Sequence, residues 1–181
     1  MDNDSRLIII RGNSGSGKST AARELQMRLG RNTLIISQDI VRRQMLYVRD
    51  GQDTPALSLL ADLLNYGHSH CRHVILEGIL YADWYEPLFK QAVNIFGNRI
   101  YAYYYDLSFE ETLKRHATRK ERSDFGEQEM RQWWRNRDYL KIISEKIFKA
   151  EITLDDAVDL VIYAWQHGEN GDLFVQKAPA A

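Results

Sequence analysis

Short runs of apolar residues alternate along the chain with longer stretches in which apolar residues recur every three or four positions. A short, uninterrupted apolar run between turn-forming residues suits a β-strand that is buried on both faces. The pattern predicts strands at Leu7–Ile10, Leu34–Ile36, Val74–Leu76 and Arg99–Tyr105, with Glu145–Phe148 as a short strand at the edge of the sheet.

The periodic stretches between these runs predict helices, because apolar residues at such a spacing fall on one face of a helix. We also expect the highly charged stretch Ser108–Lys141 to be helical. Residues that favour helix ends flank most of the periodic stretches. Helix starts are expected at Thr54–Pro55, at Asp83 with Glu86 and at Thr153 with Asp156, and helix stops at Gly30, Gly67 and Gly97.

Strands that alternate with helices pair in parallel through right-handed crossovers, so that helices cover both faces of the sheet. The expected fold is a three-layer α/β/α structure with a mainly parallel, five-stranded sheet. A chain of 181 residues, of which 44% are hydrophobic, can bury one core. We expect one domain in residues 1–167 and a mobile tail in residues 168–181, where apolar residues are few.

Composition narrows the class of protein further. The formal net charge of -1 argues against wholesale binding of nucleic acid or of an acidic membrane surface. Cys71 is the single cysteine, which rules out an internal disulfide. Near it lie His68, His70 and His73, which we interpret as structural because no second cysteine completes a zinc site. The acidic start and the lack of an apolar run of membrane-spanning length favour a cytoplasmic protein.

The strongest functional signal is the segment Gly12–Ser19, which reads Gly-Asn-Ser-Gly-Ser-Gly-Lys-Ser and matches the pattern G-x-x-x-x-G-K-[ST]. It lies between a predicted strand and a predicted helix, where a phosphate-binding loop (P-loop) belongs. Its glycines let backbone N–H groups converge on phosphate oxygens, and the helix N-terminus adds a favourable dipole. The alternative, a glycine-rich turn without a ligand, is disfavoured by this context.

Within this loop, single residues have separate expected roles. We expect Lys18 to reach the β- and γ-phosphates of a nucleoside triphosphate, and the Ser19 hydroxyl to ligate Mg²⁺. Thr20 borders the loop and is expected to serve mainly the helix. The residues that cradle the phosphates are Gly12, Asn13, Ser14, Gly15, Ser16 and Gly17.

Acidic residues follow three of the predicted strands, at the edge where such sheets bind ligands. Asp39 is the candidate base that accepts the proton of an attacking hydroxyl, with the N-cap of the next helix as the alternative. Glu77 is expected near Mg²⁺ and its waters, with a plain exit from the strand as the alternative. Asp106 is assigned to a turn before a helix that Ser108 and Glu111 begin.

Positive charge gathers in the stretch after the fourth strand. On a helix, Arg115, Arg119 and Arg122 share one face, and we expect them to close over a polyphosphate as part of a lid at about residues 115–127. A solvated helix face with salt bridges is the alternative. For the pair Trp133–Trp134 we expect packing in the core rather than stacking on a ligand.

Together these segments resemble the small P-loop kinases, the branch that holds polynucleotide kinase, zeta toxins, chloramphenicol phosphotransferase and unassigned uridine-kinase-like bacterial proteins. The resemblance covers roughly Leu7 to Trp165. The run Asp39–Arg42 is similar to the Asp-x-x-Arg of polynucleotide 5′-kinases, which implies that Arg42 contacts the acceptor. Segments that resemble the unassigned bacterial group are Leu76–Leu80, Phe109–Thr112 with Arg115–His116, and Phe125–Glu127 with Trp133–Trp134.

The loop and the resemblance imply an ATP-dependent kinase that transfers the γ-phosphoryl group to a hydroxyl of a nucleoside, a sugar or an antibiotic-like molecule. Lys18, Asp39 and the lid arginines are then catalytic, and Glu77 contacts both the substrate and Mg²⁺. A nucleic-acid 5′-hydroxyl kinase is the alternative among enzymes, favoured by Arg42 and disfavoured by the overall charge. From another class, a nucleotide-binding regulatory module with little catalysis needs no base at Asp39.

Overall fold

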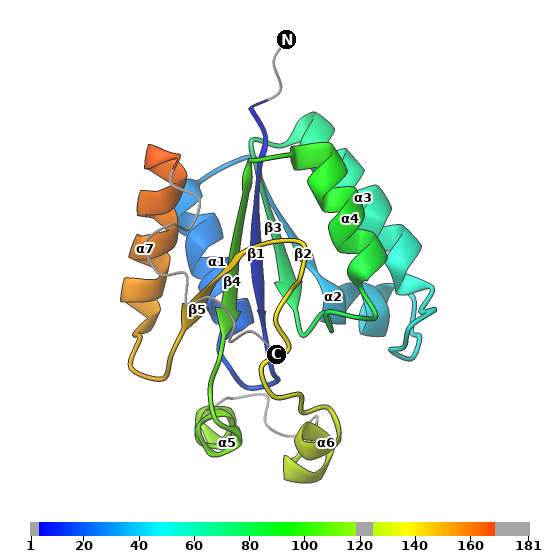
Figure 1. Cartoon of the computed structure of the whole chain (residues 1–181), viewed down its shortest axis with the longest axis vertical. Helices are drawn as coiled ribbons and strands as arrows, with labels where there is room; N and C mark the ends of the chain where they lie inside the picture. The colour runs from blue at the N-terminus through cyan, green and yellow to red at the C-terminus, as the bar shows by residue number, and fades with distance from the viewer. Residues whose placement is uncertain (1–3, 119–124, 169–181) are drawn as a thin grey trace.

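The computed structural model describes residues 4–118 and 125–168 (Figure 1). Its strands are β1 (Arg6–Gly12), β2 (Thr33–Ser37), β3 (His73–Gly78), β4 (Ile100–Tyr105) and β5 (Glu145–Phe148). They form one five-stranded sheet in the order β2-β3-β1-β4-β5, in which each neighbouring pair is parallel. The five predicted strands are confirmed, including the short edge strand.

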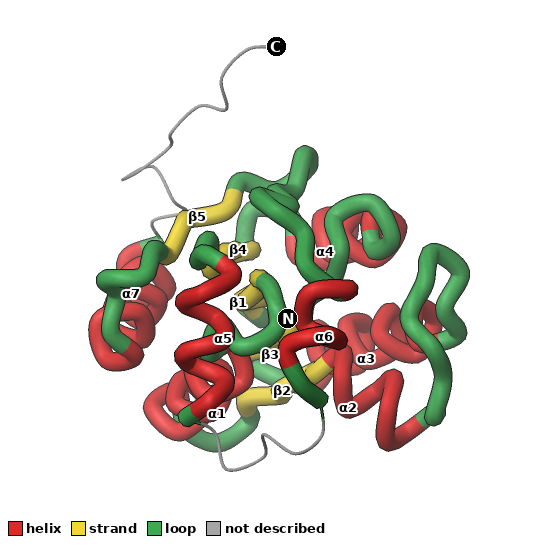
Figure 2. The backbone as a smooth tube through the Cα atoms, turned by 90° about the horizontal axis from the view of Figure 1, so that it is seen from below, coloured by secondary structure: helices red, strands yellow, loops and turns green. Residues whose placement is uncertain are grey.

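Helices lie on both faces of this sheet. They are α1 (Lys18–Leu29), α2 (Gln38–Ile40), the π-helix η1 (Val41–Met45), α3 (Ala56–His70), α4 (Glu86–Phe96), α5 (Phe109–Ala117), α6 (Glu127–Gln132) and α7 (Leu154–His167). Helices α1 and α7 cover one face and α3 and α4 the other, while α5 and α6 lie beyond the carboxyl ends of the strands (Figures 1 and 2). The three predicted layers are confirmed. No described helix is long and apolar enough to cross a membrane.

The uninterrupted apolar run of β1 follows from this arrangement, because both faces of the strand are buried. Successive side chains of a strand point to opposite faces. Leu7 and Ile9 join the core cluster that includes residues of α3 and α4, whereas Ile8 and Ile10 join the cluster that includes residues of α1 and α7. The strand that leads into the P-loop is therefore anchored on both sides.

Several helix ends lie where the sequence places them. At the start of α7, the Thr153 hydroxyl accepts a hydrogen bond from the backbone N–H of Asp156 at 3.1 Å. Gly30 and Gly97 directly follow α1 and α4 and adopt positive φ angles of 82° and 56°. These local signals act within one or two turns of the chain, so neighbouring elements do not override them.

Two predicted helix ends are wrong. Helix α3 continues past Gly67, whose missing side chain makes room for β3: a Cβ there would lie 2.7 Å from a methyl carbon of Val74. Helix α4 begins at Glu86 rather than at Asp83, because the Asp83 carboxylate is paired with Arg135 and does not cap the helix. In both places, a contact with a distant segment outweighs the local signal.

Of the described residues in the stretch Ser108–Lys141, which we expected to be helical, only those of α5 and α6 form α-helices, and residues 133–144 form an irregular segment. A buried guanidinium explains this departure. Arg11, on β1, donates from Nη1 to the Glu145 carboxylate at 2.8 Å and from Nη2 to the Asp138 carboxylate at 2.9 Å. Its Nε donates to the carbonyl oxygen of Leu80 at 2.9 Å. The irregular segment bends toward the sheet to supply these partners.

The burial of this network is nearly complete. The side chain of Arg11 is 0% exposed and that of Glu145 is 2% exposed. Burial raises the pKa of Glu145, although the charge of Arg11 opposes this effect. A buried charge is tolerated only where it is paired and hydrogen-bonded, so each member of the network requires the others.

Replacement of Arg11 by Met should destabilise the fold strongly, because it leaves the carboxylates of Asp138 and Glu145 without their cation. Breaking a buried ion pair from one side costs about 3–5 kcal/mol, measured here as the free energy of unfolding in urea. A triple variant that adds Asp138→Asn and Glu145→Gln should recover part of this loss. If the single variant stays within about 1 kcal/mol of the wild type, the network contributes little to stability.

His73 is buried at the amino ends of the strands, where it begins β3. Its ring packs edge-on against Trp165 of α7, with the ring centroids 4.8 Å apart. Burial, together with the charges of Arg72 and Arg6, lowers the pKa of His73 to about 4, and Asp4 opposes this shift. The folded protein therefore takes up a proton at His73 less readily than the unfolded chain does.

This difference makes stability depend on pH. The unfolded histidine titrates near 6.5, so the contribution of neutral His73 is complete above that pH and is lost as the pH falls toward about 4. We expect His73→Gln to flatten the plot of unfolding free energy against pH within this window. The difference between variant and wild type measured at about pH 8 serves as the reference. An unchanged acid slope in the variant would contradict the assignment.

Candidate functional site

The segment Gly12–Ser19 connects the end of β1 to the start of α1, as the sequence predicts. Gly12 and Gly15 have positive φ angles of 141° and 81°, which glycine adopts without strain. Neighbouring backbone also excludes side chains here. A Cβ on Gly12 would lie 2.9 Å from the carbonyl oxygen of Tyr105, and one on Gly15 would lie 2.6 Å from that of Thr112. The loop therefore wraps tightly between β4 and α5.

Lys18 lies inside this loop rather than on its outer surface. Its Nζ donates to the carbonyl oxygen of Asn13 at 2.8 Å and to the Ser16 hydroxyl at 3.2 Å, and the side chain is buried. The ammonium group thus lies where phosphate oxygens bound by the loop would meet it. Ser14 is partly buried in the loop, and Thr20 is exposed on α1.

Ser19 and Glu77 meet at the carboxyl edge of the sheet. The Ser19 hydroxyl donates to Glu77 Oε2 at 3.0 Å, and Glu77 is buried on β3, in register with Ile10 and Ser37 of the neighbouring strands. Hydroxyl and carboxylate oxygens are the protein ligands that Mg²⁺ prefers, directly or through water. These two residues fit a magnesium ion beside the phosphates, so the structure brings together the pair that the sequence assigns to the metal.

Asp39 lies in α2, just beyond the end of β2, with its side chain 52% exposed. Arg42 donates from Nη2 to Asp39 Oδ1 at 2.9 Å, which pairs the two residues that the resemblance links. Arg43, which the sequence analysis did not select, also reaches Asp39 Oδ1, at 3.3 Å from its Nε. The N-cap of α2 is Ser37, so Asp39 does not cap this helix.

Asp106 belongs to the connection between β4 and α5, as expected. Its carboxylate accepts a hydrogen bond from the Tyr139 hydroxyl at 2.8 Å and pairs with Lys149. The Ser108 hydroxyl caps α5 by accepting from the backbone N–H of Glu111 at 3.2 Å. Asp106 therefore fastens the irregular segment and β5 to the end of β4.

Arg115 touches the P-loop. Its Nη1 donates to the carbonyl oxygen of Ser16 at 3.2 Å, its Nη2 to that of Ala150 at 2.9 Å, and its Nε to the Glu111 carboxylate at 2.7 Å. The other two predicted lid arginines, Arg119 and Arg122, lie outside the described residues. The convergence of all three on a polyphosphate stays a prediction.

A cavity of about 200 Å³ opens beside the P-loop, on the side of the sheet that α1 and α7 cover. It is large enough for a planar ring. Its walls include Gly17, Tyr105, Arg115, Thr118, Ile152 and Thr153. Another cavity, of about 240 Å³, lies between α4 and the edge of β4 and β5 and has no P-loop residue in its walls.

The two adjacent tryptophans lie beside the site rather than in either core cluster, so the expectation that both pack in the core is wrong. Trp133 packs edge-on against Phe125, and the guanidinium of Arg43 lies 5.3 Å from its ring centroid. Trp134 packs edge-on against Phe109 of α5. Both rings are partly buried, and α5 and α6 stand away from the sheet (Figure 1).

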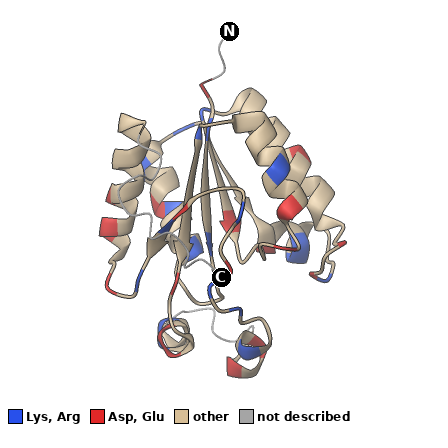
Figure 3. Ribbon diagram, in the orientation of Figure 1, with Lys and Arg blue, Asp and Glu red and all other residues tan. Residues whose placement is uncertain are grey.

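The structure also brings a residue to the site that the sequence analysis missed. Arg135, in the irregular segment, is hydrogen-bonded through its backbone to the Asn13 side chain and is paired with Asp83. Residues of both charges lie around the carboxyl ends of the strands (Figure 3). Sequence spacing gave no signal for Arg135, because its partners are 122 and 52 residues away along the chain.

The three-layer parallel fold, the wrapped P-loop and the Ser19–Glu77 pair define a small P-loop kinase. The family model described as an AAA domain, AAA_33, matches residues 7–140, and the chain belongs to this family.

Solved structures support the fold. The chain is similar to a gluconokinase from Sinorhizobium meliloti 1021, with a TM-score of 0.65 and 13% identity over 90% of this chain and 92% of that one. It is also similar to the Mycobacterium tuberculosis APS kinase in complex with AMPPNP and APS, with a TM-score of 0.64 and 15% identity over 90% of this chain and 98% of that one. These identities show a shared fold.

A local likeness to curated proteins also exists. A stretch of 42 residues is 48% identical to the UDP-glucose 4-epimerase of Rickettsia prowazekii. This stretch is 23% of this chain and 12% of that protein, so the chain spans only a small part of the curated relatives it matches.

Glu77→Gln should weaken the dependence of nucleotide binding on Mg²⁺, because an amide replaces the buried carboxylate beside Ser19. We expect the Mg²⁺ concentration for half-maximal enhancement of ATP binding to rise about 10-fold or more, as measured by titration calorimetry. Glu86→Gln, at an exposed position on α4, is the matched control. Equal Mg²⁺ requirements for Glu77→Gln and the control would show that Glu77 does not serve the metal.

Proposed function

We propose that the protein is an ATP-dependent kinase that transfers the γ-phosphoryl group to a hydroxyl of a small-molecule acceptor. The observation that carries this proposal is the Ser19–Glu77 contact of 3.0 Å beside the inward-facing Lys18. A loop that bound nucleotide only for structural reasons would not need a buried carboxylate at the metal position. Ser19 and Glu77 would hold Mg²⁺, which would supply positive charge that stabilises the transferring phosphoryl group.

The proposed donor site extends from the P-loop to the neighbouring cavity. The backbone of Gly12–Ser19 and the Lys18 ammonium hold the phosphates, and the adenine ring occupies the cavity beside Arg115. This places the γ-phosphate toward the ends of β1 and β3. Arg115 gives up its hydrogen bonds to the carbonyl oxygens of Ser16 and Ala150 and donates to the nucleotide instead. Arg119 and Arg122 complete the lid.

The proposed acceptor site is at Asp39. The acceptor hydroxyl attacks the γ-phosphorus, a new P–O bond forms, and the bond to the bridging oxygen of ADP breaks. The proton of the hydroxyl goes to the Asp39 carboxylate, which lies outside the core and can receive it. Arg42, which pairs with Asp39 at 2.9 Å, orients the carboxylate and contacts the acceptor.

A small acceptor is favoured over a nucleic acid by the net charge of -1. The names of the similar structures, a gluconokinase and an APS kinase, support small acceptors as well. The run Asp39–Arg42 nevertheless resembles the Asp-x-x-Arg sequence of polynucleotide 5′-kinases, so a 5′-hydroxyl nucleic acid is the second candidate. Salt separates the two, because binding of a polyanion weakens steeply with ionic strength and binding of a small acceptor does not.

Asp39→Asn should lower phosphoryl transfer by about 10²- to 10⁴-fold, because the amide is nearly isosteric but cannot take the proton. ATP affinity should stay unchanged, since the P-loop holds the donor. ADP formation is measured with nucleosides, sugars, aminoglycosides and 5′-hydroxyl oligonucleotides as acceptors. Asp53→Asn, at an exposed carboxylate outside the site, is the matched control.

A companion variant, Lys18→Ala, tests the reaction itself and should abolish ADP formation with every acceptor. Turnover by Lys18→Ala at the level of the wild type would reject the kinase. Turnover by Asp39→Asn at the level of Asp53→Asn would reject Asp39 as the base while leaving the kinase in place.

A further inference from the structure

The backbone of Arg135 is fixed to the P-loop by one buried amide. Asn13 donates from Nδ2 to the carbonyl oxygen of Arg135 at 2.7 Å, and its Oδ1 accepts from the Arg135 N–H at 3.1 Å. Both polar atoms of the Asn13 side chain are thus committed to a single residue. Three residues further on, the Asp138 carboxylate is held by Arg11 at 2.9 Å. The Arg135 side chain therefore starts from a fixed point beside the phosphates.

From this point the Arg135 guanidinium extends over the loop that follows β3. It lies 4.0 Å from the ring centroid of Tyr81 and 4.9 Å from that of Trp84. Trp84 packs against the core cluster that also contains Val41 of η1. The guanidinium is therefore on the face of the sheet that α3 and α4 cover, whereas the cavity beside the P-loop opens on the face that α1 and α7 cover.

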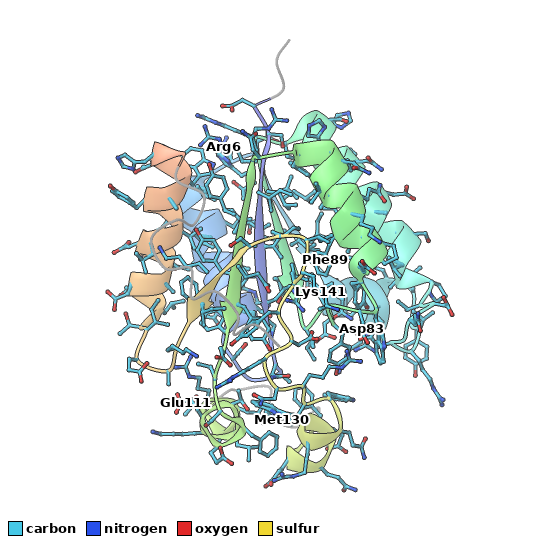
Figure 4. All side chains as sticks on the ribbon, viewed as in Figure 1. Arg6, Asp83, Phe89, Glu111, Met130 and Lys141 are labelled. Atoms are coloured by element: carbon cyan, nitrogen blue, oxygen red, sulfur yellow. The ribbon has the colours of Figure 1, made fainter. Side chains whose placement is uncertain are left out.

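The carboxylate that pairs with Arg135 is exposed. Arg135 Nη1 donates to Asp83 Oδ1, and the Asp83 side chain is 63% exposed, on the side of the sheet that α4 covers (Figure 4). The nearer oxygen of Asp138 is 3.8 Å away. Exposed ion pairs contribute at most about 1 kcal/mol, so a competing anion displaces Asp83 at little cost.

The charge of a second guanidinium also acts on Tyr81. Burial raises the pKa of Tyr81 to about 12, and the charges of Arg135 and Arg42 both oppose this rise. The Tyr81 hydroxyl donates to the Trp133 carbonyl oxygen at 2.6 Å, and the Tyr81 ring lies under the Arg135 guanidinium. Arg42 is paired with a carboxylate that is itself more than half exposed, that of Asp39. Arg42 and Arg135 are therefore two guanidinium groups whose carboxylate partners are exposed and can be exchanged.

We propose that the acceptor carries an oxyanion, a carboxylate or a phosphate, beside the hydroxyl that is phosphorylated, and that Arg135 binds this oxyanion in place of Asp83. This inference rests on the proposed kinase function and names the chemical class of its acceptor. The planar guanidinium matches an oxyanion through paired hydrogen bonds. Because Asn13 ties Arg135 to the P-loop, the same contact sets the distance between the acceptor and the γ-phosphate.

The test compares acceptors that differ in a single charged group, with ADP and Mg²⁺ bound so that the P-loop is filled. Gluconate against sorbitol tests a carboxylate, and adenosine 3′-monophosphate against adenosine tests a phosphate. Binding is followed by calorimetry and by tryptophan fluorescence, since Trp84 contacts Arg135. We expect at least one anion to bind about 10-fold or more tightly than its neutral partner.

Variants then assign this preference to residues. Arg135→Met should lower the affinity of the preferred anion about 10- to 100-fold and leave that of the neutral partner and of ADP unchanged. Asp83→Asn should raise the affinity of the anion about 2- to 5-fold, because the competing carboxylate is gone. Arg137→Met, at an exposed guanidinium in the same segment, is the matched control and should change neither.

The proposal is overturned if neither anion binds more tightly than its neutral partner, or if Arg135→Met keeps the preference. ADP formation from ATP with the same compounds separates this result from the kinase function. Turnover with the neutral compounds alone would keep the kinase and reject the oxyanion site. An anion that binds through Arg135 and is not phosphorylated would keep the oxyanion site and count against the kinase function.

Discussion

The buried guanidinium of Arg11 is the interaction on which the site depends. It directly precedes Gly12, and its donors reach the loop after β3 through Leu80, β5 through Glu145 and the irregular segment through Asp138. A guanidinium without access to water needs partners for its N–H groups, and these partners lose much if they move. The start of the P-loop and the segments around it therefore behave as one unit.

The hydrogen bonds of the P-loop extend this unit by one more contact. Arg11 holds Asp138, and two residues later Asn13 holds Arg135, so both ends of a short piece of the irregular segment are fastened to β1 and its loop. Residues 135–138 are therefore attached to β1 and the P-loop rather than to α6. The proposed lid at about residues 115–127 is not part of this fastened piece.

The features that the sequence predicts well are those set by local pattern. The strands, the P-loop, the cap at Thr153 and the proximity of Ser19 to Glu77 follow from apolar runs, a contiguous motif and the parallel order of the sheet. What it misses depends on tertiary contacts. Arg11 looked like the end of an apolar strand, and nothing local shows that it draws residues 133–144 out of a helix. Arg135 meets Asn13 through backbone atoms, which leave no side-chain pattern.

Three arginines near the P-loop, Arg11, Arg42 and Arg135, differ in the exposure of their carboxylate partners. Arg11 is paired with the almost fully buried Glu145, whereas Arg42 and Arg135 are paired with Asp39 and Asp83, which are 52% and 63% exposed. Arg11 and Glu145 cannot exchange partners while the protein is folded, because an unpaired charge would remain buried. The other two pairs can exchange at small cost.

The exposed pairs give the proposed kinase a way to limit the hydrolysis of ATP, in which water replaces the acceptor. Before the acceptor arrives, the exposed carboxylate of Asp83 holds Arg135 in position. The exposed carboxylate of Asp39 is paired with Arg42 and Arg43. Water brings no oxyanion to exchange for Asp83, so it gains no binding energy from Arg135 and leaves both pairs in place. In the proposed reaction, an acceptor that carries an oxyanion releases Arg135 and is held at the P-loop while its hydroxyl reaches Asp39, so binding energy is spent on orienting the correct nucleophile.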